Sequence, residues 1–152
     1  MSPGQYALGK ARLKLGALVL FGFPGSPMVY YGDEAGLEGF EDPSTAAPIP
    51  GEGRTASCWN GTRPGEARRA LPALRRGELA WTLTRGRVLS FLRTGAEGSV
   101  LAAVNAGDRP EPMDLPWPAR DWMTGAAWNR GSRRSLHDGL AADAPAGRSV
   151  NC

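Results

Sequence analysis

The chain has 152 residues, with 18 Lys and Arg against 15 Asp and Glu, which gives a formal charge of +3. This length suits one domain better than two. The 21 glycines and 13 prolines favour turns, and a hydrophobic content of 41% is enough for a core and excludes wholesale disorder. The 2 cysteines and single histidine exclude a disulfide framework and a multi-histidine metal site. We therefore expect no metal and no cofactor.

The apolar stretch near the N-terminus runs from Leu15 to Phe23. It is about half as long as a helix that spans a bilayer. It meets Pro24 and Pro27 without a small-residue cleavage site, so it does not fit a secretory signal. We expect a cytoplasmic protein with no membrane partner.

Residues 5–22 are predicted to form a helix, because their apolar side chains recur at helical spacing. The sequence GFPGSP at residues 22–27 must end that helix, since its prolines and glycines cannot continue it. Residues 28–31 (MVYY) then predict a short buried strand, and an acidic loop follows as far as Pro43. This order is typical of a parallel α/β unit, whose loop after the strand faces the active site.

The rest of the chain divides into three predicted parts. Residues 44–70 have no clear period and are expected to be an irregular linker. Residues 71–125 form a predicted β domain, and residues 126–152 are expected to be an irregular tail. The β domain is predicted because short apolar runs alternate with turn signals, a pattern that favours an antiparallel sheet or sandwich. Its candidate strands are residues 79–83, 88–93, 99–105 and a shorter run at 113–115.

The segment FPGSPMVYYGDEAGLEGFEDP, from Phe23 to Pro43, closely resembles the last barrel strand of the alpha-amylase superfamily (glycoside hydrolase family thirteen). Its extension is most similar to neopullulanases and cyclomaltodextrinases. The resemblance implies an α+β fold for this chain. Residues 1–43 would be the last helix and strand of a (β/α)8 barrel, and residues 71–125 would be a C-terminal domain like a β-sandwich. The family pattern Gly-x-Pro-x-x-Tyr-x-Gly-Asp/Glu-Glu is filled by Gly25, Pro27, Tyr30, Gly32, Asp33 and Glu34.

The resemblance also has consequences for chemistry. Enzymes of this family hydrolyse glucans with carboxylates that act as nucleophile, acid/base and transition-state stabiliser, on barrel strands four, five and seven. No residue of this chain matches one of those positions. The resemblance therefore implies an α-glucan or maltooligosaccharide as partner of a parent protein, and no catalytic residue and no activity in this chain alone. The alternative from another class is a small, non-catalytic carbohydrate-binding β module, supported only by the tryptophans Trp81, Trp117, Trp122 and Trp128.

Four residues are candidates for substrate binding by that resemblance: Asp42, Tyr31, Asp33 and Glu34. Asp42 belongs to the sugar-facing loop in relatives. A paired Asp33 and Glu34 would suit general acid/base work, but we favour lining of the cleft wall or capping of the next helix. One of the two adjacent tyrosines is expected in the core, and Trp81 and Trp117 are expected to be buried in the β domain rather than exposed as a sugar platform.

After the Asp-Pro pair, relatives continue with a stretch near Phe-Asn-Arg-Arg-Pro-Tyr-Pro-Trp-Gly, whereas this chain has STAAPIPGEGR. The same bases read one position earlier permit the relatives' residues. Our hypothesis is that residues 44 to about 70 are translated out of frame, with a compensating change near Leu71. Much of the basic excess lies in this segment and in the tail, which contains Arg130, Arg133 and Arg134. The positive charge is therefore poor evidence for nucleic-acid binding, and we expect no nucleic-acid partner.

Overall fold

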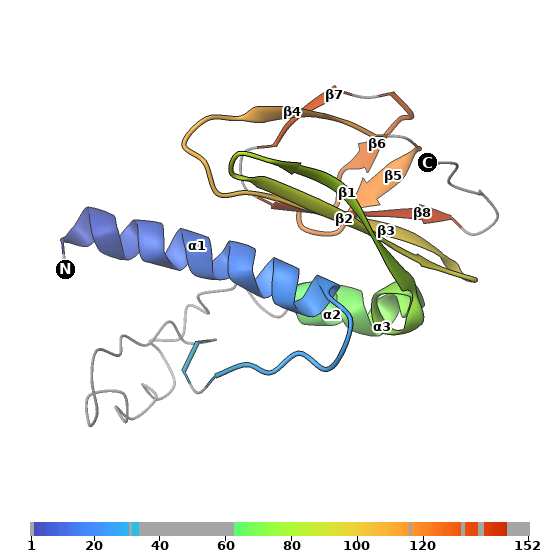
Figure 1. The fold of residues 1–152 in the computed structure, drawn as a ribbon, viewed down its shortest axis with the longest axis horizontal. Helices are drawn as coiled ribbons and strands as arrows, with labels where there is room; N and C mark the ends of the chain where they lie inside the picture. The colour runs from blue at the N-terminus through green and yellow to red at the C-terminus, as the bar shows by residue number, and fades with distance from the viewer. Residues whose placement is uncertain are drawn as a thin grey trace.

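The computed structural model describes residues 2–30, 32–33, 63–115, 117–131, 133–136 and 139–145, the last two ranges as backbone only. Within this part of the chain, helices come first and strands follow (Figure 1). The mixture of helices and antiparallel sheet confirms the α+β class. The elements are α1 (Pro3–Gly22), α2 (Arg63–Ala70), α3 (Pro72–Arg76), β1 (Glu78–Arg85), β2 (Val88–Gly95), β3 (Gly98–Asn105), β4 (Glu111–Asp114), β5 (Ala119–Asp121), β6 (Ala127–Trp128), β7 (Arg133–Leu136) and β8 (Gly139–Pro145).

Helix α1 confirms the helix predicted at residues 5–22 and begins slightly earlier. The Ser2 hydroxyl accepts a hydrogen bond from the Gln5 N–H at 3.3 Å, and the Gln5 side-chain oxygen accepts one from the Ser2 N–H at 2.9 Å. This reciprocal capping box satisfies two backbone donors at the start of the helix. The buried residues of α1 are Ala17, Leu18 and Gly22, all near its C-terminal end. The other end extends away from the sheet (Figure 1).

The strands form a six-stranded sheet in the order β1-β2-β3-β8-β5-β6 and a two-stranded sheet of β4 and β7. All described pairs are antiparallel. The first two strands meet at a tight turn in which Arg85 pairs with Val88, and Gly86 takes a φ of 60°, a conformation that favours glycine. Strands β1, β2 and β3 confirm the strands predicted at residues 79–83, 88–93 and 99–105, and β4 overlaps the run predicted at 113–115.

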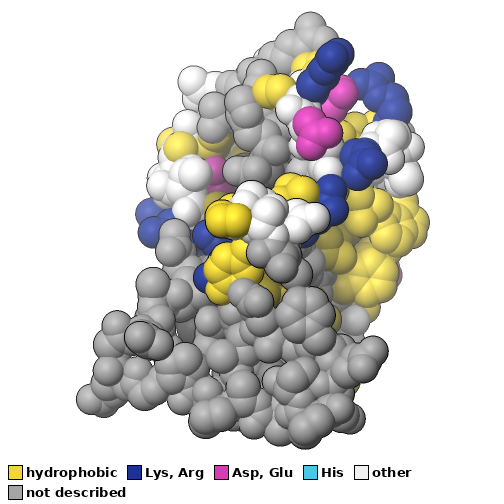
Figure 2. Space-filling model, turned by 90° about the vertical axis from the view of Figure 1, so that its left-hand side faces the viewer, with side chains coloured by type: hydrophobic (Ala, Val, Ile, Leu, Met, Phe, Trp, Pro, Cys, Tyr) yellow, Lys and Arg dark blue, Asp and Glu magenta, His cyan; other side chains and the backbone are white. Residues whose placement is uncertain are grey.

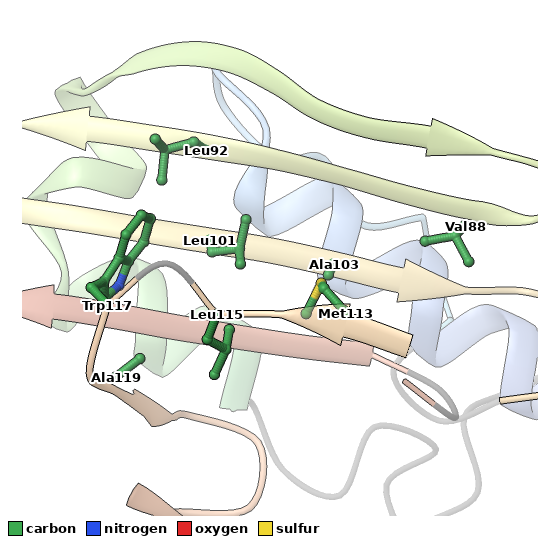
Figure 3. Close-up of a cluster of buried hydrophobic side chains, with 8 residues drawn as sticks. All are labelled: Val88, Leu92, Leu101, Ala103, Met113, Leu115, Trp117 and Ala119. Atoms are coloured by element: carbon green, nitrogen blue, oxygen red, sulfur yellow. The ribbon is translucent and has the colours of Figure 1, made fainter. Parts of the chain in front are cut away.

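Both faces of the six-stranded sheet are covered, as the layers in Figure 1 show. The helices lie on one side, where Val100 and Ala102 of β3 pack. On the other side, Leu101 and Ala103 of the same strand belong to a second cluster (Figure 3). Alternate side chains of a strand point to opposite faces, so β3 contributes to both clusters and is the central strand of the core. The cluster of Figure 3 comprises Val88, Leu92, Leu101, Ala103, Met113, Leu115, Trp117 and Ala119.

Strand β1 contains a β-bulge that redirects its side chains. Trp81 pairs with Phe91, but Leu83 pairs with Ser90, so the register shifts between them. A bulge of this kind inserts one extra residue and turns the following side chain to the other face. As a result Trp81 stays on the helix side, in ring contact with Phe91, whereas Leu83 packs against the opposite cluster.

The prediction of a buried strand at residues 28–31 is wrong over 28–30, where the described chain has no strand. Met28 is 82% exposed and Tyr30 is 67% exposed. A strand is stabilised by hydrogen bonds to a neighbouring strand, and none of the described strands pairs with this segment. The local apolar run is therefore insufficient to form a strand.

The two segments expected to be irregular also differ from the prediction. Helix α2 occupies residues 63–70, the described end of the linker predicted at 44–70; residues 44–62 lie outside the described residues. Strands β6, β7 and β8 lie in the predicted tail at 126–152. Strand β8 pairs with β3 along its length, from Gly139 opposite Val104 to Pro145 opposite Gly98. Its sequence GLAADAP has little β-propensity, so pairing with β3, rather than a local signal, stabilises this strand. The predicted domain boundaries themselves stay predictions.

Large hydrophobic side chains also lie on the surface of the described part. On the face shown in Figure 2, hydrophobic side chains gather beside several Lys and Arg side chains. Single exposed hydrophobic residues are ordinary in folded proteins, whereas clusters of them indicate a contact surface. The exposed large hydrophobic residues of the described part are Leu8, Leu20, Phe23, Met28, Tyr30 and Trp81.

Candidate functional site

The predicted site lies where the chain turns after residue 30. The Asp33 N–H donates a hydrogen bond to the Tyr30 carbonyl at 3.1 Å. Gly32 lies between them with a φ of 88° and is buried. Only glycine adopts such a φ without strain, which explains why the sequence has glycine here. The turn leaves Asp33 partly exposed at the start of the predicted acidic loop.

Of the four predicted substrate-binding residues, the structure describes Asp33. Tyr31, Glu34 and Asp42 lie outside the described residues. The predicted grouping of these four side chains therefore stays a prediction, as does the cleft-lining role of Asp33.

The two tryptophans that were expected to be buried have different environments. Trp117 is 5% exposed and belongs to the cluster of Figure 3, as predicted. Trp81 is 56% exposed, so the expectation of burial is wrong for this residue. Its ring contacts Phe23 and Phe91, each at 5.8 Å between centroids. Because β1 is an edge strand, no further strand covers the outer side of Trp81 in the described sheet.

Arg93 is a buried cation that sequence reasoning missed. It is 1% exposed and lies on β2, two residues after Phe91 and therefore on the helix side of the sheet. Its Nη1 donates to the Gly22 carbonyl at 2.7 Å, and its Nη2 donates to the Gly77 carbonyl at 2.8 Å. Gly22 ends α1 and Gly77 follows α3, so one guanidinium joins the C-terminal ends of two helices.

Arg68 of α2 adds a second guanidinium at the same end of α1. Its Nη1 donates to the carbonyls of Phe21 at 2.7 Å, Phe23 at 3.0 Å and Leu74 at 2.7 Å. Its Nη2 donates to the Gly25 carbonyl. The Arg68 side chain therefore connects α2, by hydrogen bonds, to α3, to the end of α1 and to the segment that follows α1.

Arg68 lies close enough to Arg93 to lower the pKa of that buried guanidinium. Burial lowers the pKa of Arg93, and the nearby Arg68 lowers it further. Burial, and then Arg75, lower the pKa of Arg68. Both groups stay protonated all the same, because guanidinium groups in proteins are not deprotonated in the ordinary pH range. Arg93 follows Phe91 by two residues and therefore shares its buried face of the strand. That spacing of two was the signal in the sequence that could have identified Arg93 as buried.

The described residues contain no group of three or more His, Cys, Asp or Glu side chains that could hold a metal ion. No helix among them is both long enough and apolar enough to cross a membrane.

The sequence is similar to amylopullulanases and cyclomaltodextrinases, although no protein-family model matches it. It is 49% identical to an amylopullulanase of Thermoanaerobacter thermohydrosulfuricus over 43 residues, which is 28% of this chain and 3% of that protein. It is 28% identical to a cyclomaltodextrinase of Geobacillus thermopakistaniensis over 126 residues, which is 74% of this chain and 20% of that protein. The chain therefore spans about a fifth of the length of this cyclomaltodextrinase.

The fold also matches solved structures of this class. An alpha-amylase from Anoxybacillus superposes with a TM-score of 0.78 at 25% identity, over 92% of this chain and 33% of that chain. The match covers most of the chain and not the β domain alone. Together these matches confirm the resemblance to the alpha-amylase superfamily, with relatives named cyclomaltodextrinase and amylopullulanase.

Proposed function

We propose that this chain, which resembles part of an alpha-amylase superfamily enzyme, provides the last helix–strand unit and the C-terminal β domain of an α-glucan hydrolase. Residues 28–31 would become a strand only by pairing with a neighbouring barrel strand of the parent protein. The observation that carries the proposal is the superposition on the Anoxybacillus alpha-amylase, which takes in 92% of this chain but a third of the enzyme. The substrate class would be α-glucans or maltooligosaccharides, bound by the parent protein. In this reading residues 1–43 belong to the barrel and residues 71–125 to a β-sandwich.

The chain alone is proposed to have no hydrolytic activity. Hydrolysis by this family needs two carboxylates on opposite sides of the glycosidic bond, one as acid/base and one as nucleophile. By the resemblance, those residues lie on barrel strands that this sequence does not match. Asp33, the described member of the acidic loop, lies after the last strand position, where it would line the cleft and leave the chemistry to other residues.

A reducing-end assay tests this part of the proposal. Purified full-length chain is incubated with maltoheptaose, soluble starch and pullulan, and a cyclomaltodextrinase serves as the positive control. We expect release of reducing ends at the rate of buffer alone. Release well above buffer, abolished by Asp33→Asn, would overturn the proposal, because the acidic loop would then perform catalysis itself.

Exposed Trp81 favours one alternative, a non-catalytic carbohydrate-binding module. A Trp ring held by two Phe rings on a surface is a suitable platform for the apolar face of a sugar. Affinity electrophoresis through gels containing amylose or pullulan separates the two functions. Retardation of the full chain that Trp81→Ala removes would favour the module, whereas equal mobility with and without glucan supports the hydrolase-part proposal.

A further inference from the structure

The C-terminal end of α1 interacts with cations that α1 itself does not supply. Its last turn contains no basic residue. The carbonyl groups at this end carry the partial negative charge of the helix dipole, and a nearby cation stabilises them. Arg93 of β2 and Arg68 of α2 bring two such cations from distant parts of the sequence.

The approach of these groups depends on two glycines. A Cβ on Gly22 would lie 3.0 Å from the ring of Phe91, and a Cβ on Gly77 would lie 2.5 Å from the Ala73 carbonyl oxygen. Without side chains, both glycines bring their carbonyls within hydrogen-bond distance of Arg93. A buried guanidinium is costly unless its donors are bonded. Both Nη atoms of Arg93 have carbonyl partners, whereas its buried Nε has no hydrogen-bond partner among the described residues, so Arg93 favours the relative position of the two helix ends that keeps both Nη bonds.

Apolar contacts alone give α1 little orientational preference. In its C-terminal half, apolar residues occupy most sides of the helix. Its apolar contact with the sheet is made by buried Leu18 and by partly buried Leu15 and Val19, which pack against Phe91 and Ala102. Non-directional burial permits small rotations and shifts of such a helix. Hydrogen bonds from a planar guanidinium are directional and therefore restrict those movements.

We infer that Arg68 and Arg93 are positioning residues that fix the C-terminal end of α1, and the chain from it toward Asp33, against strands β2 and β3. Through them the β domain sets the position of the segment that leads into the acidic loop. The inference rests on the described contacts and does not depend on the proposed hydrolase function.

Hydrogen–deuterium exchange of the full chain tests this inference. Arg68→Met is compared with Arg69→Met, which removes the same charge from the next, exposed position of α2. Because a hydrogen bond to a charged group contributes substantially to local stability, amide exchange at residues 15–25 is expected to rise about tenfold or more in Arg68→Met. Exchange in β2 and β3 is expected to stay unchanged, and Arg69→Met is expected to leave both regions as in the parent chain.

Arg93→Lys provides the second measurement. Lysine keeps the charge but lacks the fork that reaches two carbonyls at once, so exchange at residues 15–25 should again rise while β2 and β3 stay protected. If Arg68→Met does not fold, Arg68→Lys is measured in its place with the same expectation. Unchanged exchange at residues 15–25, an equal rise in β2 and β3, or the same effect in Arg69→Met would each overturn the inference.

Discussion

Replacement of Gly77 by alanine tests the packing between α3 and the sheet. The new Cβ would lie 2.5 Å from the Ala73 carbonyl oxygen and 2.8 Å from that of Thr94, both backbone atoms. Ordinary carbon–oxygen contacts are about 3.3 Å or longer, so the backbone must move by roughly 0.5–1 Å. Gly77 has a φ of −70°, so the expected strain is steric and not conformational.

The expected cost follows from the contacts that this movement disturbs. Overpacking of this kind costs about 1–3 kcal/mol. The movement also weakens the hydrogen bond from Arg93 to the Gly77 carbonyl, now 2.8 Å, and the bond from the Gly77 N–H to Ala73, now 2.9 Å. We expect the free energy of unfolding to fall by about 3 kcal/mol in total, since a hydrogen bond to a charged group contributes about 1.5–3 kcal/mol.

Urea unfolding followed by tryptophan fluorescence measures the effect. With a slope of about 2 kcal/mol per molar urea, the midpoint of Gly77→Ala should fall by about 1.5 M. Gly16→Ala is the matched control, because apart from the neighbouring backbone of α1 itself no atom lies within 4 Å of the new Cβ. Alanine is preferred to glycine there by about 1 kcal/mol, so this midpoint should rise by about 0.5 M. Equal midpoints for the two variants would refute the steric reasoning.

Three further predictions concern other parts of the chain. Trp117→Ala should lower the free energy of unfolding by about 3–5 kcal/mol because the side chain is buried, whereas Trp81→Ala, at a more exposed position, should lower it by about 1 kcal/mol. Thermal unfolding measures both variants, and equal falls in melting temperature would contradict this prediction. Ser2→Ala removes the capping box of α1 and should lower the stability of its first turn by about 1 kcal/mol. Amide exchange in the first turn should become faster, and unchanged exchange there would contradict the prediction. The coding bases under residues 44 to about 70, read one position earlier, should spell the relatives' residues, with a compensating change near Leu71; bases under Ser44 to Gly51 that do not spell them would contradict the hypothesis.

Elements with strong local signals were predictable from the sequence. Helix α1 has an apolar pattern and a proline-rich stop, and the turns around Gly86 and between Gly95 and Gly98 fix the first three strands. In these elements the local sequence preference agrees with the tertiary structure, so the sequence predicts their bounds to within a few residues.

Elements that depend on distant partners were not predictable. Strand β8 has a weak sequence of its own and is held by β3, and α2 contributes Arg68 to carbonyls more than forty positions earlier in the chain. The reverse also occurred at residues 28–30, where a strong local strand signal finds no neighbouring strand. Tertiary pairing therefore decided these elements, and local propensity did not.

The candidate site was only partly predictable. The turn at Gly32 and Asp33 agrees with the motif, because a positive φ at that point needs glycine. The Arg68 and Arg93 contacts were missed, since their carbonyl partners are backbone atoms whose positions a sequence does not reveal. The exposure of Trp81 was missed because β1 is an edge strand, and the order of strands in a sheet cannot be read from the local sequence.

The most direct measurement of whether this chain provides part of an α-glucan hydrolase is the activity of a chimera. Residues 63–145 of this chain replace the matching segment of the Geobacillus thermopakistaniensis cyclomaltodextrinase, and hydrolysis of maltoheptaose is compared with that of the enzyme lacking the segment. If the fold is shared, we expect a folded chimera that hydrolyses maltoheptaose at a rate clearly above that of the enzyme lacking the segment. A chimera that fails to fold, or folds without activity, would contradict the proposed function.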